Sequence, residues 1–98
     1  MNRNLRFTLE AAGQLKALQT NPAQVRVRKA VEKTLGLMQT NLRHSGLQTH
    51  EYFMLTKQLG FKVFEAYAQN KTPGAYRVFW HYGPDKDEIT IVSITAHP

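Results

Sequence analysis

Charged side chains stand inside two segments that otherwise have the composition of β-strands. Glu65 lies within residues 61–68 and Arg77 within residues 75–82, and both segments are rich in aromatic and β-branched residues. The guanidinium could hold an anion, or the carboxylate and the guanidinium on neighbouring strands could form a structural ion pair. Because a buried arginine needs a partner, we expect Arg77 to face solvent, an anion or Glu65.

Strand parity assigns these residues to faces of the sheet. Successive side chains of a strand point to opposite faces, so Arg77, Phe79 and His81 share one face. On the preceding strand, the same rule puts Glu65 on one face and Lys62 on the other. Parity alone leaves open which face of each strand meets water.

Histidine is the other residue type with useful chemistry, and the chain has four: His44, His50, His81 and His97. The closest pair, His44 and His50, lies in an expected loop where Glu51 is the nearest acidic ligand, so the spacing does not predict a metal site. The sequence has no P-loop, no dinucleotide-binding glycine fingerprint and no motif around a serine nucleophile. We therefore expect neither a metal nor an organic cofactor.

The net charge of +6 is concentrated in one half of the chain. Residues 1–60 contain nine basic and three acidic side chains, whereas residues 61–98 contain four of each. A one-sided basic field attracts phosphate groups or an acidic protein and raises the rate of encounter with them. A basic surface that serves solubility alone remains the alternative.

Two helices are predicted in the first half of the chain, after a short opening strand around residues 5–9. Thr8 can cap the first helix, over residues 9–19, whose apolar stripe is Leu9, Ala12, Leu15 and Leu18. Asn21-Pro22 starts the second helix, which extends to about residue 40. Its apolar stripe contains Val27, Ala30, Val31, Thr34, Leu35 and Met38, and a separate basic stripe contains Arg26, Lys29 and Lys33.

Three strands are predicted in the second half, over residues 61–68, 75–82 and 88–96, with turn-forming residues between them. Residues 41–52 are typical of a loop, and residues 53–60 remain unassigned. Short turns between consecutive strands indicate an antiparallel meander. The order is β-α-α-β-β-β, an α+β fold in which a two-helix hairpin packs on one face of a small, mainly antiparallel sheet. We expect Val27, Val31, Leu35, Val92 and Ile94 to be buried.

Length and composition indicate a single domain over residues 1–98. The absence of cysteine excludes a disulfide scaffold and a zinc–thiolate site, and it fits a reducing compartment. The N-terminus, Met-Asn-Arg-Asn-Leu-Arg-Phe, is not followed by the apolar run of a secretory signal, and no segment approaches the length of a membrane span. We expect a cytoplasmic protein.

Four segments occur in an order and spacing that resemble a known family. They are the loop 41–50, the strand segment 62–67, the strand Gly-Ala-Tyr-Arg-Val-Phe at 74–79, and the end Ile-Thr-Ala-His-Pro at 94–98. This pattern resembles the RelE/ParE toxin superfamily of type II toxin–antitoxin systems, which typically has a Gly-x-Tyr-Arg-hydrophobic-hydrophobic strand and a final hydrophobic strand ending near a histidine or basic residue. The resemblance spans nearly the whole chain and implies the same fold.

The resemblance implies one of two activities. RelE-like members are ribosome-dependent mRNA endonucleases that inhibit translation, whereas ParE-like members bind and poison DNA gyrase. Both are held silent by a cognate antitoxin, usually acidic, and the complex often represses its own operator DNA. The nuclease is our first interpretation, with mRNA and the ribosome as partners. The gyrase poison is the second, and a nucleic-acid-binding domain without toxin activity is the third.

The resemblance also implies roles for four residues. Arg77 matches the strand arginine that would brace the scissile phosphate, and Lys62 matches a basic position on the preceding strand of the RelE branch. Glu65 resembles a strand glutamate that can serve as a base, and His97 falls where nuclease members place a terminal acid or base. The basic residues expected to contact nucleic acid are Arg26, Lys29, Lys33, Arg43 and Lys57.

The sequence also departs from the nuclease branch. Phe64 and Tyr67 stand where basic residues are common in nuclease members, and the sequence stops at Pro98 without a basic or tyrosine-bearing tail. The reduced basic set favours the binding interpretation, whereas Lys62 and His97 favour the nuclease.

Overall fold

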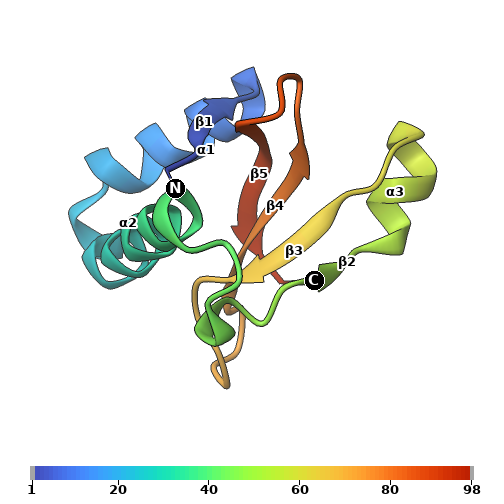
Figure 1. Cartoon of the computed structure of the whole chain (residues 1–98). Helices are drawn as coiled ribbons and strands as arrows, with labels where there is room; N and C mark the ends of the chain where they lie inside the picture. The colour runs from blue at the N-terminus through green and yellow to red at the C-terminus, as the bar shows by residue number, and fades with distance from the viewer. Residues whose placement is uncertain (1, 98) are drawn as a thin grey trace.

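The computed structural model describes residues 2–97, so Met1 and Pro98 lie outside the described part of the chain. A short strand and two long helices begin the chain, and its two longest strands end it (Figure 1). The elements are β1 (Asn4–Phe7), α1 (Leu9–Thr20), η1 (Pro22–Gln24), α2 (Val25–Thr40), η2 (Ser45–Leu47), β2 (His50–Glu51), α3 (Phe53–Leu59), β3 (Phe64–Tyr67), β4 (Tyr76–Tyr82) and β5 (Glu88–Ala96), where η denotes a short 3-10 helix.

The helix starts confirm the predicted caps. The Thr8 side chain accepts a hydrogen bond from the backbone N–H of Ala11 at 3.0 Å, which satisfies a donor that has no partner inside α1. Asn21 does the same for Ala23 at 3.0 Å. Pro22 then begins the short 3-10 helix η1, and α2 follows directly, so the predicted second helix has a tighter first turn.

The sheet has five strands in the order β1-β5-β4-β3-β2. β1 runs parallel to β5, and the other neighbours are antiparallel, which confirms the mainly antiparallel sheet and the meander of β3, β4 and β5. α1 and α2 lie together on one side of the sheet, while α3 projects away from them beyond β2 (Figure 1). Within residues 2–97, the opposite face of the sheet has no layer of long helices over it (Figure 1).

Residues 41–60 correct the sequence-based interpretation. The predicted loop contains η2 and the two-residue strand β2, and residues 53–59 form α3, which ends at Gly60 in the left-handed conformation (φ 84°). β3 begins at Phe64 rather than at residue 61, because the backbone of Val63 forms hydrogen bonds with α3 and with the residue before it instead of with a neighbouring strand. Val63 donates its N–H to the Thr56 side chain at 2.9 Å and accepts from the N–H of Tyr52 at 2.8 Å.

The hydrophobic core lies between the two long helices and the sheet, with Trp80 and Met38 as its largest fully buried side chains. Val31, Leu35 and Ile94 are buried as predicted. Val27 and Val92 are only partly buried, so this part of the prediction was wrong. For Val92 the reason is a β-bulge: Phe79 pairs with Ser93 and Trp80 with Ile91, which leaves Val92 without a partner on β4.

The buried face of α1 also differs from the predicted stripe. Ala11 and Leu18 are buried and Leu15 is partly buried, whereas Leu9 is 94% exposed and Ala12 is exposed. Residues 11, 15 and 18 follow the same helical period as the predicted stripe but are rotated around the axis from it. Gln14 fixes this rotation, because its side-chain oxygen accepts a hydrogen bond from the backbone N–H of Ile94 at 2.6 Å.

Among residues 2–97, no helix has both the length and the apolar character needed to cross a membrane.

The rotation of α1 can be tested with two leucines of the same helix. Leu18→Ala is expected to reduce the free energy of unfolding by about 2–5 kcal/mol, because it leaves a cavity in the core. Leu9→Ala is expected to change it by no more than about 0.5 kcal/mol, because that side chain is in water. Chemical denaturation followed by circular dichroism measures both. Equal losses would contradict the observed helix rotation.

Candidate active site on the open face of the sheet

The face of the sheet turned away from α1 and α2 carries the polar residues of β3 and β4. Val78 and Trp80 belong to the core, so Arg77 and Phe79 point to the opposite face. Glu65 is directly opposite Phe79 in the β3–β4 pairing. Aromatic rings line this face, because Tyr52 packs on Phe79 with ring centroids 4.9 Å apart. Water is therefore excluded from part of the open face, and the charged groups of Glu65 and Arg77 are buried there.

Glu65 is the centre of this site, with only 1% of the residue exposed. Its two carboxylate oxygens face three groups that can carry positive charge. Oε1 is 2.6 Å from Nε2 of His50, and Oε2 is 3.7 Å both from Nε of Arg77 and from Nε2 of His97. A buried carboxylate is strongly unfavourable unless it is compensated, and these three side chains provide the compensation.

Arg77 is also buried, with 7% of the residue exposed. Its guanidinium lies 3.7 Å above the centre of the Tyr67 ring, and Nη1 donates a hydrogen bond to the backbone oxygen of Gln69 at 2.5 Å. Nε of Arg77 and Oε2 of Glu65 have no hydrogen-bond partner, because 3.7 Å is too long for one. The guanidinium of Arg77 and the carboxylate of Glu65 therefore form an ion pair without a hydrogen bond between Nε and Oε2. This ion pair is one of the alternatives that the sequence left open. Only the small exposed part of Arg77 can meet a ligand.

The two histidines of the site reach the surface. The His50 side chain is 49% exposed and that of His97 is 44% exposed, in contrast to the buried Glu65 and Arg77 beside them. β2 places His50 directly opposite Glu65 in the β2–β3 pairing. His97 follows β5, and its backbone N–H is held by the oxygen of Ala75 at 2.7 Å. Two accessible imidazoles thus stand on either side of one buried carboxylate.

Three of the four predicted catalytic residues are brought together: Glu65, Arg77 and His97. His50 is the functional candidate that the sequence reasoning missed, because it was considered only as a metal ligand. Its position depends on the pairing of a two-residue strand, which no periodicity can reveal. The available signal was its place at the end of the loop 41–50, one of the segments that carry the family resemblance.

Lys62 is not part of this cluster. It is exposed and precedes β3, so it does not follow the strand parity assumed for it. It lines a separate groove of about 570 Å³ together with Phe61, Phe64, His81 and Tyr82. Among the described residues, no ion pair or hydrogen bond joins Lys62 to Glu65 in the way that one joins His50.

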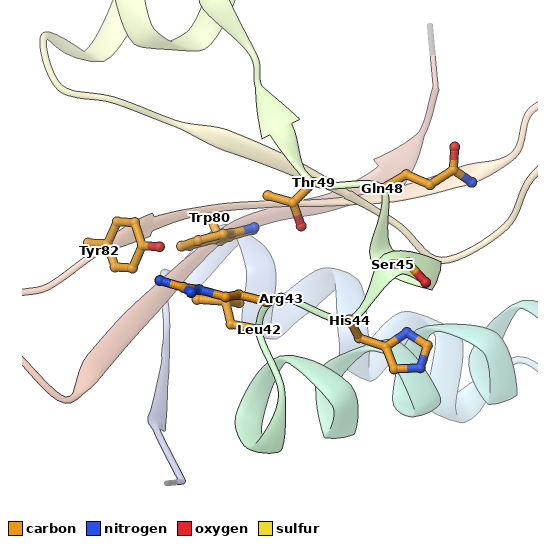
Figure 2. A pocket seen from close by; sticks show the side chains of 8 residues that line it. All are labelled: Leu42, Arg43, His44, Ser45, Gln48, Thr49, Trp80 and Tyr82. Carbon is orange, nitrogen blue, oxygen red and sulfur yellow. The ribbon is translucent and has the colours of Figure 1, made fainter.

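The five basic residues predicted to contact nucleic acid do not share one surface. Arg26, Lys29 and Lys33 are exposed on α2, as predicted, and Lys57 is exposed on α3. These helices lie on opposite sides of the molecule (Figure 1). Arg43 lines a cavity of about 390 Å³, where its side chain extends toward Trp80 and Tyr82 (Figure 2). The α2 stripe is thus the one continuous basic surface among these predicted residues.

Within residues 2–97, no group of three or more histidine, cysteine or acidic side chains has an arrangement that could hold a metal ion. A carboxylate, a guanidinium and two imidazoles can bind an anion and can give and accept protons.

Comparison with known proteins identifies the fold but finds no close relative in sequence. No protein-family model matches the chain, and no curated protein matches it. Solved structures do match over the full length. A YoeB/ParE toxin from Agrobacterium tumefaciens has a TM-score of 0.71 at 9% identity, with 97% of this chain and 99% of that chain covered.

Two further structures agree with this result. The YoeB dimer from Staphylococcus aureus has a TM-score of 0.66 at 17% identity, with both chains fully covered. The archaeal RelE–RelB complex from Pyrococcus horikoshii has a TM-score of 0.63 at 12% identity, with 98% of this chain and 96% of that chain covered. The α+β fold that the sequence predicted is confirmed as the fold of these toxins.

The ion pair at the centre of the site can be tested through stability. Arg77→Met should lower the free energy of unfolding by about 3–5 kcal/mol, because it leaves the Glu65 carboxylate buried without its guanidinium. The double variant Glu65→Leu/Arg77→Met should recover most of that loss, since it removes both charges. Chemical denaturation measures all three proteins.

The exposed pair of Arg6 and Glu88 is the matched control for this experiment. Its atoms are 3.4 Å apart and the Arg6 side chain is 57% exposed, so Arg6→Met should cost less than about 1 kcal/mol. If Arg77→Met costs no more than Arg6→Met, Glu65 does not depend on Arg77.

Proposed function

We propose that this chain, which has the fold of the RelE/ParE toxins, is the toxin of a type II toxin–antitoxin system and cleaves mRNA on the ribosome. Structures named for YoeB, ParE and RelE toxins match it from end to end. The family resemblance in the sequence points the same way. In this proposal the protein inhibits translation in the cytoplasm, where its substrate is found.

The observation that carries the nuclease proposal is the cluster of Glu65, Arg77, His50 and His97 on the open face. A protein that acts only by binding a topoisomerase has no need for two accessible imidazoles beside a buried carboxylate. Cleavage of RNA without a metal needs groups of this kind. It requires an acid, a base and positive charge close to a phosphate.

The reaction uses the 2′-hydroxyl of RNA as its nucleophile, so DNA is not a substrate. The 2′-oxygen attacks the adjacent phosphorus, a base takes its proton, and an acid protonates the leaving 5′-oxygen. In our assignment His97 exchanges one of these protons. Arg77 contributes charge to the developing phosphorane, Glu65 holds the acid–base groups, and Lys62 adds positive field from its nearby groove.

A cognate antitoxin is the proposed protein partner, as in the RelE–RelB complex from P. horikoshii. The net charge of +6 favours an acidic partner. Apolar side chains on and after α3 are exposed and would be covered by it. They are Phe53, Met54, Leu59 and Phe61. A partner that covers this surface and the adjoining open face would bury about 2,000 Å² or more, and it would close the site to RNA.

Primer extension on translated mRNA tests the nuclease directly. The wild-type protein is expected to produce sharp cuts that require ribosomes, and His97→Ala is expected to reduce them by about 10²–10⁴-fold, because an acid or base is lost. The His97 side chain is 44% exposed and lies 3.7 Å from Glu65, so its loss should lower the free energy of unfolding by less than the loss of Arg77, and the variant should remain folded. If the protein makes no cuts but inhibits supercoiling by gyrase, the nuclease proposal is wrong and the ParE-like activity takes its place.

The basic stripe of α2 is proposed to bind ribosomal RNA without sequence preference. Each phosphate contact releases counterions, so replacing Arg26, Lys29 and Lys33 together by alanine should lower the slope of log K against log salt by about 2–3. Binding to a structured RNA over a salt series measures this slope. Lys86→Ala, in the exposed turn between β4 and β5, is the control and should change it far less. An unchanged slope in the triple variant would show that the basic stripe faces solvent and does not contact RNA.

A further inference from the structure

The side of the sheet that faces the helices has a cavity of its own. Its volume is about 390 Å³, and its walls are the rings of Trp80 and Tyr82 on β4 and residues of the segment 42–49 between α2 and β2 (Figure 2). Trp80 belongs to the core under the helices, so it lies on the opposite face of β4 from Arg77. The cavity is therefore separate from the cluster around Glu65, and its volume is within the range of small-molecule sites.

The charge around this cavity is positive. Arg43 is one of the lining residues, and its side chain extends toward Tyr82 (Figure 2). The guanidinium carbon of Arg3 lies 5.7 Å from the centre of the Tyr82 ring. No lining residue is acidic, and within residues 2–97 neither arginine forms an ion pair with a carboxylate. Two guanidinium groups that no carboxylate neutralises favour an anionic ligand here.

The indole of Trp80 adds a hydrogen-bond donor to the wall. The residue is 1% exposed, and its Nε1 is buried without a hydrogen-bond partner among the described residues. An indole nitrogen can only donate, and a buried one usually has an acceptor. The nitrogen edge of the ring is on the side of Thr49 (Figure 2). Thr49 is an exposed residue, so its side chain can rotate and admit an acceptor oxygen to this donor.

The chemistry of the lining selects one class of anion. A guanidinium binds a phosphate group through two parallel hydrogen bonds, and hydroxyls such as those of Ser45 and Thr49 can serve the remaining oxygens. Tyr82 is 56% exposed and offers an aromatic surface against which a nucleobase can stack. Inorganic phosphate alone would fill only a small part of the cavity. A phosphate ester that carries a planar ring would use both the charge and the aromatic wall.

We propose that this cavity binds a nucleoside monophosphate. Arg43 holds its phosphate with the help of the field of Arg3, the indole N–H of Trp80 donates to one phosphate oxygen, and the base lies against Tyr82. The inference goes beyond the proposed nuclease and does not depend on it, because the residues that carry it are on the other face of the sheet from Glu65.

The chain has a single tryptophan, so its indole signal reports on this cavity alone. Uridine and adenosine 5′-monophosphates, added to the wild-type protein, should each cause a saturable downfield shift of the indole N–H in ¹⁵N–¹H correlation spectra, because the donor gains an anionic acceptor. Uridine, adenosine and inorganic phosphate should each bind at least about tenfold more weakly than the nucleotides, since each lacks one of the two recognised parts. This titration requires no variant to fold.

Two arginine variants locate the phosphate. Arg43→Gln should weaken nucleotide binding by at least about tenfold, which corresponds to the loss of one charge-assisted hydrogen bond. Arg28→Gln is the matched control, because it removes the same charge from an arginine that is paired with Glu32 and does not line the cavity. It should bind as the wild type does. His97→Ala should also titrate like the wild type, which separates this cavity from the candidate active site.

Four results would overturn the proposal. An indole signal that neither nucleotide shifts would exclude the site, and nucleosides that bind as tightly as nucleotides would exclude phosphate recognition. Inorganic phosphate that binds as tightly as the nucleotides would exclude the role of Tyr82. Equal weakening in Arg43→Gln and Arg28→Gln would show that net charge, rather than this cavity, attracts the ligand. None of these results changes the expected cutting of mRNA, so the nuclease proposal stands or falls by its own test.

Discussion

The buried carboxylate of Glu65 is the constraint on which the site depends. Removing such a group from water costs several kcal/mol, and the cost is offset only where opposite charge and hydrogen bonds are supplied in the right geometry. His50, Arg77 and His97 supply them from β2, from β4 and from the residue that follows β5. Three separate parts of the chain must therefore be in register before Glu65 can be accommodated, which couples formation of the site to formation of the sheet.

The two faces of the sheet divide stability and chemistry between them. The face under α1 and α2 is apolar, with Trp80 and Ile91 among its fully buried residues, and it provides the hydrophobic contribution to folding. The opposite face buries charge beneath aromatic rings such as Tyr67, where low dielectric strengthens each electrostatic contact. Because successive residues of β4 serve opposite faces, Val78 stabilises the fold while Arg77 and Phe79 build the site.

Burial is graded within the site in a way that suits acid–base chemistry. The charged groups Glu65 and Arg77 are held below the surface, and the two imidazoles are half exposed above them. Histidine exchanges protons near neutral pH, so the accessible groups are also the ones able to react. The basic stripe of α2 belongs to the helical layer, separate from this face (Figure 1). Binding of a polyanion and proton transfer would therefore be carried by different surfaces.

The sequence alone determined the α+β class, the caps at Thr8 and Asn21, both long helices, and the three strands of the meander, because periodicity and capping are local properties. Strand parity correctly put Arg77 and Phe79 on one face, and the family resemblance selected Glu65 and His97. Tertiary structure decided the rest. The rotation of α1 depends on a contact between Gln14 and β5, and α3 forms without a periodic signal. His50 joins the site through a two-residue strand, since the pairing of β2 with β3 is a long-range contact that no local pattern encodes.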